Sequence, residues 1–284
     1  ARNVEILPQS VDIIEFLRSD VVLVSYAALS AKLKGTDQTL AQKLIGAAVF
    51  TQQALGSRYN AYKIREHERP TTELSTEEIF TQCSQSVFNI AVYDEEGEFL
   101  RRGNGFFIDD TGIAVTNYRT IAGVYSAKII LPDTGEECKV LGVYDYNMKQ
   151  DWAILKIEGS DFSYLEIGDK TSVVGGASVY SIGRPTGLQN IISSGIITNP
   201  NKSFNNLPYI QSNTGISPGD SGGALLNKYG EVIGITTSVF VNGQNLNLAL
   251  PILYIENYSK SSVTPIESFV SVVTGHTKPG YTNN

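Results

Sequence analysis

The sequence predicts a mainly β domain that follows a helical N-terminal segment. From about residue 86 onward, short runs alternate apolar and polar residues as half-buried strands do, and Gly, Asp and Asn turns separate them. Before that point, apolar residues recur at helical spacing over residues 9–56. Tyr (15), Phe (11) and Gly (26) are numerous, which is typical of strand-and-turn proteins. Many short strands at this spacing predict a β-barrel or a β-sandwich.

Residues 1–66 are expected to form two or three packed helices. Apolar side chains follow one helix face in residues 10–17, residues 21–33 are richly apolar, and Asp37 is a suitable N-cap for a third run that ends at Gly56. We hypothesise that this segment binds a partner or mediates oligomerisation.

Residues 67–78 are expected to be a linker followed by a helix cap. Charges alternate up to Pro70, and the run from Ser75 to Glu78 has the pattern of a capping box that opens a short helix. The β domain is assigned to residues 79–260, with strands predicted at 87–93, 178–182 and 231–236. Residues 261–284 are polar and are expected to form a C-terminal tail.

Composition excludes several classes of protein. The net charge of −7 disfavours a nucleic-acid or lipid-surface binder, since both need a basic face, and no apolar run is long enough for a membrane span. Cys83 and Cys138 either form one bridge or, as we favour, are two buried thiols. With only His67 and His276 present, and no metal-ligand spacing, we expect no metal site and no cofactor. The compartment stays open between secreted or periplasmic and cytoplasmic.

Three motifs appear in a fixed order along the β domain. The first is GNGFF at 103–107 with TNYR at 116–119, the second is DWAILK at 151–156, and the third is GDSGG at 219–223. NLALPI follows at 247–252. Together they resemble the trypsin-like peptidases of the HtrA/Deg type over about residues 79–258. The resemblance implies a chymotrypsin-like double β-barrel with the active site between the barrels, and a peptide or protein as the substrate. No segment resembles the peptide-binding PDZ domain that many Deg proteins append.

The resemblance also implies roles for individual residues. Ser221 is at the nucleophile position, the N–H groups of Gly219 and Ser221 are at the oxyanion hole, and Asp151 is at the position of the acid that orients the base. The substrate pocket is expected to involve four residues: Gly215, Ile216, Thr236 and Thr237. These include no acid, so cleavage after Arg or Lys is not implied.

Arg119 stands where the family has its catalytic histidine. A guanidinium stays protonated at ordinary pH and offers only donors, so it cannot accept the proton of Ser221. His67 and His276 are expected to be solvated surface residues rather than substitutes. The sequence therefore predicts a serine endopeptidase that is inactive as written, with a natural pseudoprotease that binds peptides or partners as the alternative. It also predicts that the Arg119 cation lies within reach of Asp151.

Overall fold

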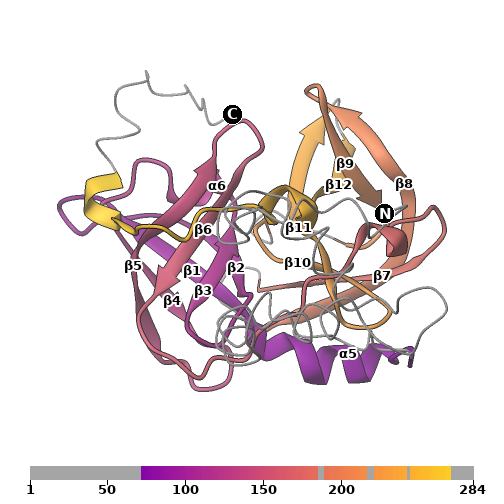
Figure 1. Ribbon diagram of the computed structural model, residues 1–284, viewed down its shortest axis with the longest axis horizontal. Coiled ribbons are helices and arrows are strands. Elements are labelled where there is room, and N and C mark those ends of the chain that lie inside the picture. Colours follow the sequence, from indigo (N-terminus) through magenta and orange to yellow (C-terminus); the bar gives the residue numbers. More distant parts are fainter. Residues whose placement is uncertain (1–71, 185–188, 216–220, 242–243, 270–284) are drawn as a thin grey trace, which may run out of the picture. The chain divides into compact units, whose positions relative to one another are not determined.

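The structure is a computed structural model, which describes residues 72–184, 189–215, 221–241 and 244–269 (Figure 1). The helical segment expected over residues 1–66 lies outside these ranges, as do His67 and His276. Two closed barrels of six strands each make up the described part. The expectation of a mainly β, chymotrypsin-like double barrel is confirmed.

The first barrel closes in the strand order β5-β4-β1-β2-β3-β6, with β6 pairing back to β5. Its strands are β1 (Val87–Tyr93), β2 (Phe99–Phe107), β3 (Ile113–Thr116), β4 (Ser126–Ile130), β5 (Glu137–Asn147) and β6 (Trp152–Ile157). The short helix α6 (Tyr118–Ile121) follows β3. All ladders are antiparallel, so neighbouring strands are mostly joined by tight turns.

The second barrel closes in the order β10-β11-β12-β9-β8-β7. Its strands are β7 (Ser178–Gly183), β8 (Ile191–Phe204), β9 (Leu207–Ser212), β10 (Ala224–Asn227), β11 (Val232–Val241) and β12 (Gln244–Pro251). The described residues also include the 3-10 turns η2 (Ser84–Ser86), η3 (Lys170–Ser172) and η5 (Ile252–Ile255). The strands predicted at 87–93, 178–182 and 231–236 correspond to β1, β7 and the first half of β11.

The helix α5 (Thr76–Cys83) precedes the first barrel. Ser75 Oγ accepts from the backbone N–H of Glu78 at 3.2 Å, and the Glu78 carboxylate accepts from the N–H of Ser75 at 2.8 Å. This is the predicted capping box. The pKa of Glu78 is lowered, first by the hydrogen bond that its carboxylate accepts from the backbone N–H of Ser75 and then by the Ser75 side chain, because both favour the charged carboxylate. The apolar face of α5 buries Ile79 and Cys83.

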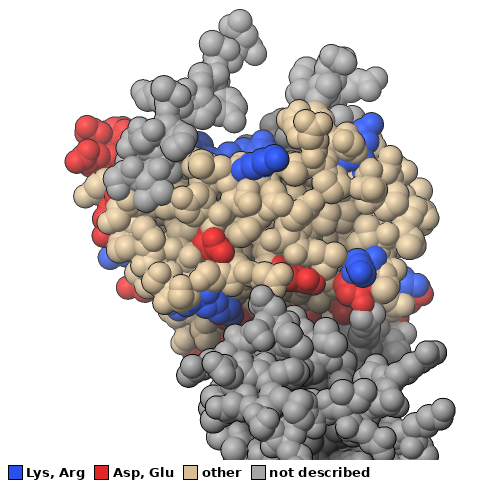
Figure 2. Space-filling view, turned by 45° about the horizontal axis from the view of Figure 1, so that its top comes forward, with Lys and Arg blue, Asp and Glu red and all other residues tan. Residues whose placement is uncertain are grey.

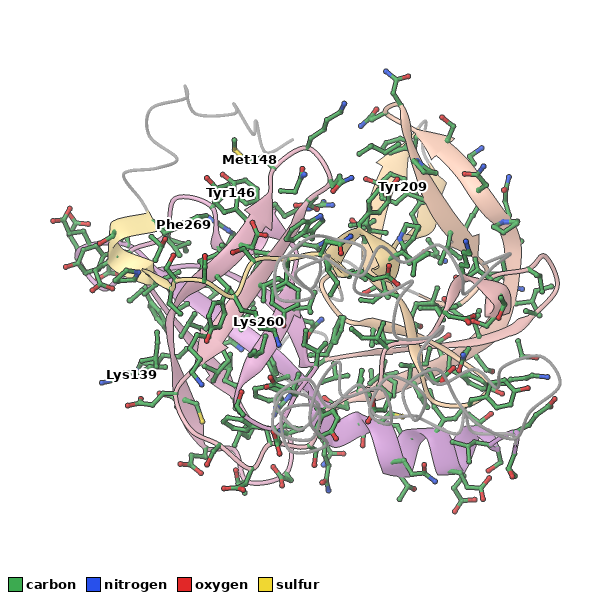
Figure 3. All side chains as sticks on the ribbon, viewed as in Figure 1. Lys139, Tyr146, Met148, Tyr209, Lys260 and Phe269 are labelled. Atoms are coloured by element: carbon green, nitrogen blue, oxygen red, sulfur yellow. The ribbon has the colours of Figure 1, made fainter. Side chains whose placement is uncertain are left out.

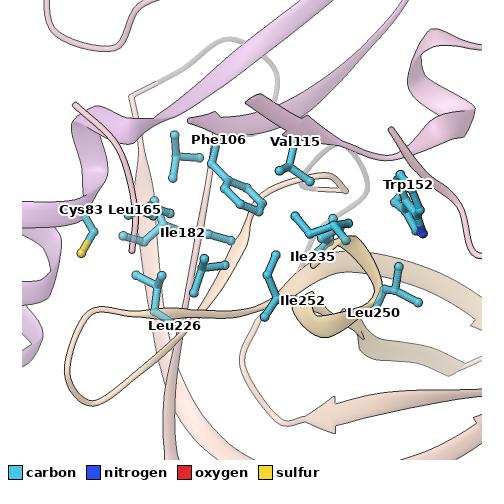
Figure 4. Close-up of a cluster of buried hydrophobic side chains, with 14 of the residues drawn as sticks. Cys83, Phe106, Val115, Trp152, Leu165, Ile182, Leu226, Ile235, Leu250 and Ile252 are labelled. Atoms are coloured by element: carbon cyan, nitrogen blue, oxygen red, sulfur yellow. The ribbon is translucent and has the colours of Figure 1, made fainter. Parts of the chain in front are cut away.

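Buried apolar side chains form one cluster between the barrels and one inside each. The cluster between them contains Phe106, Val115 and Trp152 from the first barrel together with Ile182 and Ile235 from the second (Figure 4). Burial of apolar surface contributes about 25 cal/mol per Å², so this shared cluster fixes the barrels against one another. The faces that meet there carry the end of β3 and the starts of β6 and β10, next to which the three motifs lie.

The C-terminal boundary predicted at residue 261 is too early. Residues 264–265 form β13 (Thr264–Pro265), which pairs with β5 at Val143 and Gly142. Phe269 is 1% exposed and packs edge-on against Tyr118 and Tyr146, and Figure 3 shows Phe269 beside Tyr146. Residues 264–269 therefore belong to the first barrel. The other domain boundaries remain predictions.

Cys83 and Cys138 are both free and buried, so the alternative of a bridge is wrong. Burial raises the pKa of the Cys83 thiol to about 11. The described helices include none that is long and apolar enough to cross a membrane. On the described part of the face in Figure 2, Lys and Arg are interspersed with Asp and Glu rather than gathered into one basic field.

Candidate active site

Arg119 lies on α6, the short helix that directly follows β3. Asn117 is the N-cap residue of this helix, and its side-chain amide donates to the backbone carbonyl of Asp151 at 3.0 Å. This bond ties the start of α6 to the turn before β6. The Arg119 side chain is 42% exposed, so its guanidinium is accessible to solvent and to a ligand.

Asp151 accepts from Arg119 through both carboxylate oxygens. The backbone N–H of Arg119 donates to Oδ1 at 2.9 Å, and the side-chain Nε donates to Oδ2 at 2.6 Å. The predicted pairing of Arg119 with Asp151 is confirmed. Such pairs often form through two N–H groups of one guanidinium, whereas here one of the two donors is the backbone N–H.

Asp151 is held in an uncommon backbone conformation. Its φ is 60°, in the left-handed region that Asp and Asn adopt more readily than other residues with a side chain. Asp151 is the last residue of the turn at 148–151, which joins β5 to β6.

Burial and the ion pair act on the Asp151 carboxyl in opposite directions. Burial raises the pKa of Asp151, since only 18% of its side chain is exposed, whereas the charge of Arg119 and its two hydrogen bonds lower it. Burial is the larger effect, and the pKa lies above its ordinary value. Arg119 therefore offsets only part of the desolvation of this carboxylate.

Thr237 completes the environment of the guanidinium. Its hydroxyl accepts a hydrogen bond from Nη2 of Arg119, and the residue is 2% exposed. Burial, and then the charge of Asp151, raise the pKa of Tyr209, which places this β9 ring near the pair. Neither contact was predicted, because both come from the second barrel and depend on how it packs against the first.

The turn that carries Ser221 is anchored to both barrels. The Ser221 carbonyl accepts from the backbone N–H of Asn104 in β2 at 2.9 Å, and the N–H of Gly222 donates to the Thr236 carbonyl in β11 at 2.8 Å. Gly222 has a φ of +94°, and a Cβ there would lie 2.1 Å from the Asn104 carbonyl oxygen. Only glycine fits at this point of the turn.

Asn104 is a site residue whose role the sequence did not indicate. It is 0% exposed, its carbonyl accepts from the Thr116 hydroxyl at 2.6 Å, and its side-chain oxygen accepts from the N–H of Arg184 at 3.2 Å. It links the Ser221 turn to β3 and to the end of β7. Gly219 lies outside the described residues, so the oxyanion hole remains a prediction.

A small hollow lies beside the Ser221 turn. Its lining residues come from β7, β8 and β11 and the chain before the turn: Ser181, Ile182, Gly183, Ile191, Ser193, Gly215 and Thr236. Gly215 donates to Ser193 Oγ at 2.7 Å, and its carbonyl accepts from Ser181 Oγ at 3.3 Å. Two serine hydroxyls thus fix the position of Gly215.

Two of the four predicted pocket residues, Gly215 and Thr236, line this hollow. Thr237 is not one of its described lining residues and binds Arg119 instead, because successive side chains of β11 point to opposite faces. Ile216 lies outside the described residues. In the part of the chain that the structure describes, no group of three His, Cys, Asp or Glu residues could hold a metal ion.

Comparisons with known proteins agree with this geometry. Residues 103–235 match the family described as trypsin-like peptidase domain. The chain is 32% identical over 190 residues to a probable periplasmic serine endoprotease, DegP-like, of Pseudomonas savastanoi pv. phaseolicola, which covers 63% of this chain and 39% of that protein. It is 35% identical over 156 residues to a protein of the same description from Halomonas elongata, covering 53% of this chain and 32% of that one.

A solved structure gives the same result. The HtrA-type protease AlgW with tripeptide superposes with a TM-score of 0.58 at 25% identity, covering 64% of this chain and 61% of that chain. The chain covers 39% and 32% of the lengths of these two curated relatives, which is about two fifths or less. It contains a trypsin-like peptidase domain and is related to the DegP-like and HtrA-type serine proteases.

Proposed function

We propose that this domain is a serine-endopeptidase domain that binds peptides beside Ser221 and, with Arg119 at the position of the general base, hydrolyses them at no useful rate. The observation that carries the proposal is the Arg119–Asp151 pair, since the residue that meets the orienting acid is a guanidinium. The related AlgW structure was solved with a tripeptide, which supports a peptide as the ligand.

The chemistry of the two side chains explains the expected loss. A serine hydroxyl becomes a nucleophile when a neighbouring base takes its proton. Arg119 carries hydrogen on every guanidinium nitrogen and has no lone pair to offer at ordinary pH. Loss of the base in a serine-protease triad costs on the order of 10⁶-fold in rate and leaves the contribution of the oxyanion hole and of binding.

A second candidate is a natural pseudoprotease that binds peptides or partner proteins. The observation in its favour is that Arg119 is well accommodated: its backbone N–H, Nε and Nη2 all have acceptors. A random replacement of histidine by a longer cation would more often leave donors unpaired or charges unmatched. Both candidates place a peptide in the same site, and they differ in whether the natural chain carries Arg at this position.

The test is Arg119→His, with Arg119→His/Ser221→Ala as the matched control. An imidazole at this position would find the Asp151 carboxylate already oriented by the backbone N–H of residue 119. We expect a serine-directed fluorophosphonate to label Arg119→His strongly and the parent and double variant hardly at all. Equally strong labelling of the parent would contradict the proposal, and so would an Arg119→His protein that folds normally and is not labelled.

A further inference from the structure

We propose that Arg101 is a positioning residue for position 119: by binding the end of α6, it fixes the backbone of the residue that stands where the family has its base. The inference rests on the proposed function, because position 119 has a catalytic use only in a serine-endopeptidase site. It deepens that function by naming a residue outside the three motifs on which the orientation of the base position depends.

The Arg101 side chain extends from β2 to the carbonyl groups at the end of α6. Nε donates to the carbonyl of Arg119 at 3.1 Å and to that of Thr120 at 3.2 Å, and Nη2 donates to the carbonyl of Ala122. The last carbonyls of a helix have no partner within the helix, so an arginine that reaches them stabilises the helix end. One guanidinium therefore holds three carbonyls of this short helix and its C-cap.

Residue 119 is held through both of its backbone polar groups. Its N–H donates to Asp151 Oδ1 at 2.9 Å, and its C=O accepts from Arg101. The peptide groups on the two sides of its Cα are thus fixed, one by the turn before β6 and the other by β2. Because both contacts use the main chain, they do not depend on the side chain at position 119. An imidazole placed there starts from the same backbone.

A glycine two residues after Arg101 lets β2 approach α6 closely. A Cβ at Gly103 would lie 2.8 Å from both Cγ2 and Oγ1 of Thr120, so a side chain there would force Thr120 to move. Arg101 and Gly103 lie on one face of β2, since side chains alternate along a strand. Arg102 lies on the other face, where it is exposed and its guanidinium is 5.4 Å from the centre of the Phe99 ring.

The position of Arg101 in the first barrel explains why it binds α6. It is half-buried and lies opposite Val92 of β1, which is 0% exposed. A charge on such a face is costly unless it has hydrogen-bond partners, and the carbonyls of α6 supply them. Ile121 of α6 packs in the same core cluster as Val92. The ladders of β2 use only main-chain groups, so loss of the Arg101 side chain is expected to loosen α6 and leave the barrel intact.

The test compares three variants of the full chain. Arg101→Met keeps the apolar stem and loses every donor, and Arg101→Lys keeps the charge and a donor but loses the planar fork. Arg102→Met is the matched control, because it removes the neighbouring arginine from the exposed face of the same strand. Circular dichroism and thermal unfolding establish that each variant is folded. Arg101→Gln takes the place of Arg101→Met if the latter does not fold.

The first measurement is amide hydrogen exchange by NMR, which needs no activity. It compares the Arg119 N–H with the N–H of Ile157, which donates to the Gly112 carbonyl at 2.8 Å in the same barrel. In Arg101→Met we expect the Arg119 N–H to exchange about tenfold faster, the equivalent of one hydrogen bond to a charged group, and the Ile157 N–H to be unchanged. Equal acceleration of both amides, or of neither, would overturn the inference.

The second measurement places the same substitutions in the Arg119→His protein. It separates the maximal rate of fluorophosphonate labelling from the reagent concentration that gives half of this rate. A misplaced base slows the chemical step and does not weaken binding of the reagent. We expect Arg101→Met to lower the maximal rate by about tenfold at an unchanged half-saturating concentration, Arg101→Lys to recover part of the rate, and Arg102→Met to have no effect.

An unchanged maximal rate in a folded Arg101→Met protein would overturn the inference, and so would a loss confined to the half-saturating concentration. A loss of the same size in Arg102→Met would overturn it as well. Absence of labelling in the Arg119→His protein itself would contradict the proposed function instead. The exchange measurement on the full chain would then still decide whether Arg101 positions residue 119, so the two failures are distinguishable.

Discussion

Arg119 contacts both oxygens of the Asp151 carboxylate, one with its backbone N–H at 2.9 Å and the other with Nε at 2.6 Å. The first contact belongs to the backbone and survives most substitutions at position 119, whereas the second belongs to the side chain. The orientation of Asp151 is therefore only partly dependent on arginine. This is why Arg119→His is expected to find its acid in place.

Arg119→Met is expected to destabilise the protein at neutral pH by about 1–2 kcal/mol, less than the ~3–5 kcal/mol typical of breaking a fully buried pair. Burial already raises the pKa of Asp151, and removing Arg119 raises it further, so the folded state holds this proton more tightly than the unfolded state. The loss of stability relative to the parent protein therefore grows as the pH rises through the pKa of Asp151 in the folded state. It fades as the pH falls below that pKa. Thermal unfolding of both proteins between pH 3.5 and 8 would measure this difference in stability. The range is chosen to cover the titration of a carboxyl group whose pKa is raised.

The matched control is Lys128→Met, which breaks the exposed pair with Glu137. No measurable change in stability is expected there, because both side chains are largely solvated. A deficit for Arg119→Met that stays constant from acid to neutral pH would show that the ion pair is not its source.

Gly222→Ala is expected to cost more than about 2 kcal/mol, since it combines an unfavourable positive φ with a clash against backbone. The new Cβ would lie 2.1 Å from the Asn104 carbonyl oxygen. Gly97→Ala is the control, because Gly97 has a similar φ of +82° but nothing within 4 Å. Urea unfolding of the two variants separates the cost of the steric clash from the cost of the positive φ. Equal losses of unfolding free energy in the two variants would argue against the tight contact of the Ser221 turn with β2.

Phe269→Ala is expected to lose about 3–5 kcal/mol, as large-to-small changes in a well-packed core do. Its ring is 1% exposed and packs edge-on against both Tyr118 and Tyr146. Phe99→Ala removes the same side chain from a site that is 51% exposed and should cost less than about 1 kcal/mol. Similar unfolding midpoints for the two variants would contradict the assignment of residues 264–269 to the first barrel.

The Arg119→His protein is expected to cleave after small or medium apolar residues. The hollow beside Ser221 has no charged residue among its described lining residues, and a buried Lys or Arg without a counter-charge costs several kcal/mol. Asp169, which lies in the loop before η3, accepts from Thr171 and lines a different hollow, so it does not supply that counter-charge. A peptide-library profile dominated by cleavage after Arg or Lys would refute the prediction.

The strands and the Arg119–Asp151 pair could be predicted because their signals are local or ordered along the chain. Runs that alternate apolar and polar residues mark the strands. The order of the motifs along the chain pairs Arg119 with Asp151, even though 32 residues separate them. Thr237 and Asn104 carried no such signal. Their roles arise from the packing of one barrel on the other, which no short run of residues encodes.

The C-terminal boundary was wrong for a different physical reason. Residues 263–273 include apolar residues such as Val263, Ile266 and Phe269, but β13 has only two residues, too few to show a period. Burial there depends on a groove that only the folded barrel provides.

The left-handed backbone of Asp151, with its φ of 60°, also restricts which residues can replace it in the course of evolution. Aspartate, asparagine and glycine adopt this conformation at low cost, and a β-branched or bulky residue does not. An aspartate at this position is therefore favoured by conformation as well as by any chemical role. Drift at position 119 meets no such restriction, because that residue lies on an ordinary helical turn. Backbone conformation therefore restricts position 151 more tightly than position 119.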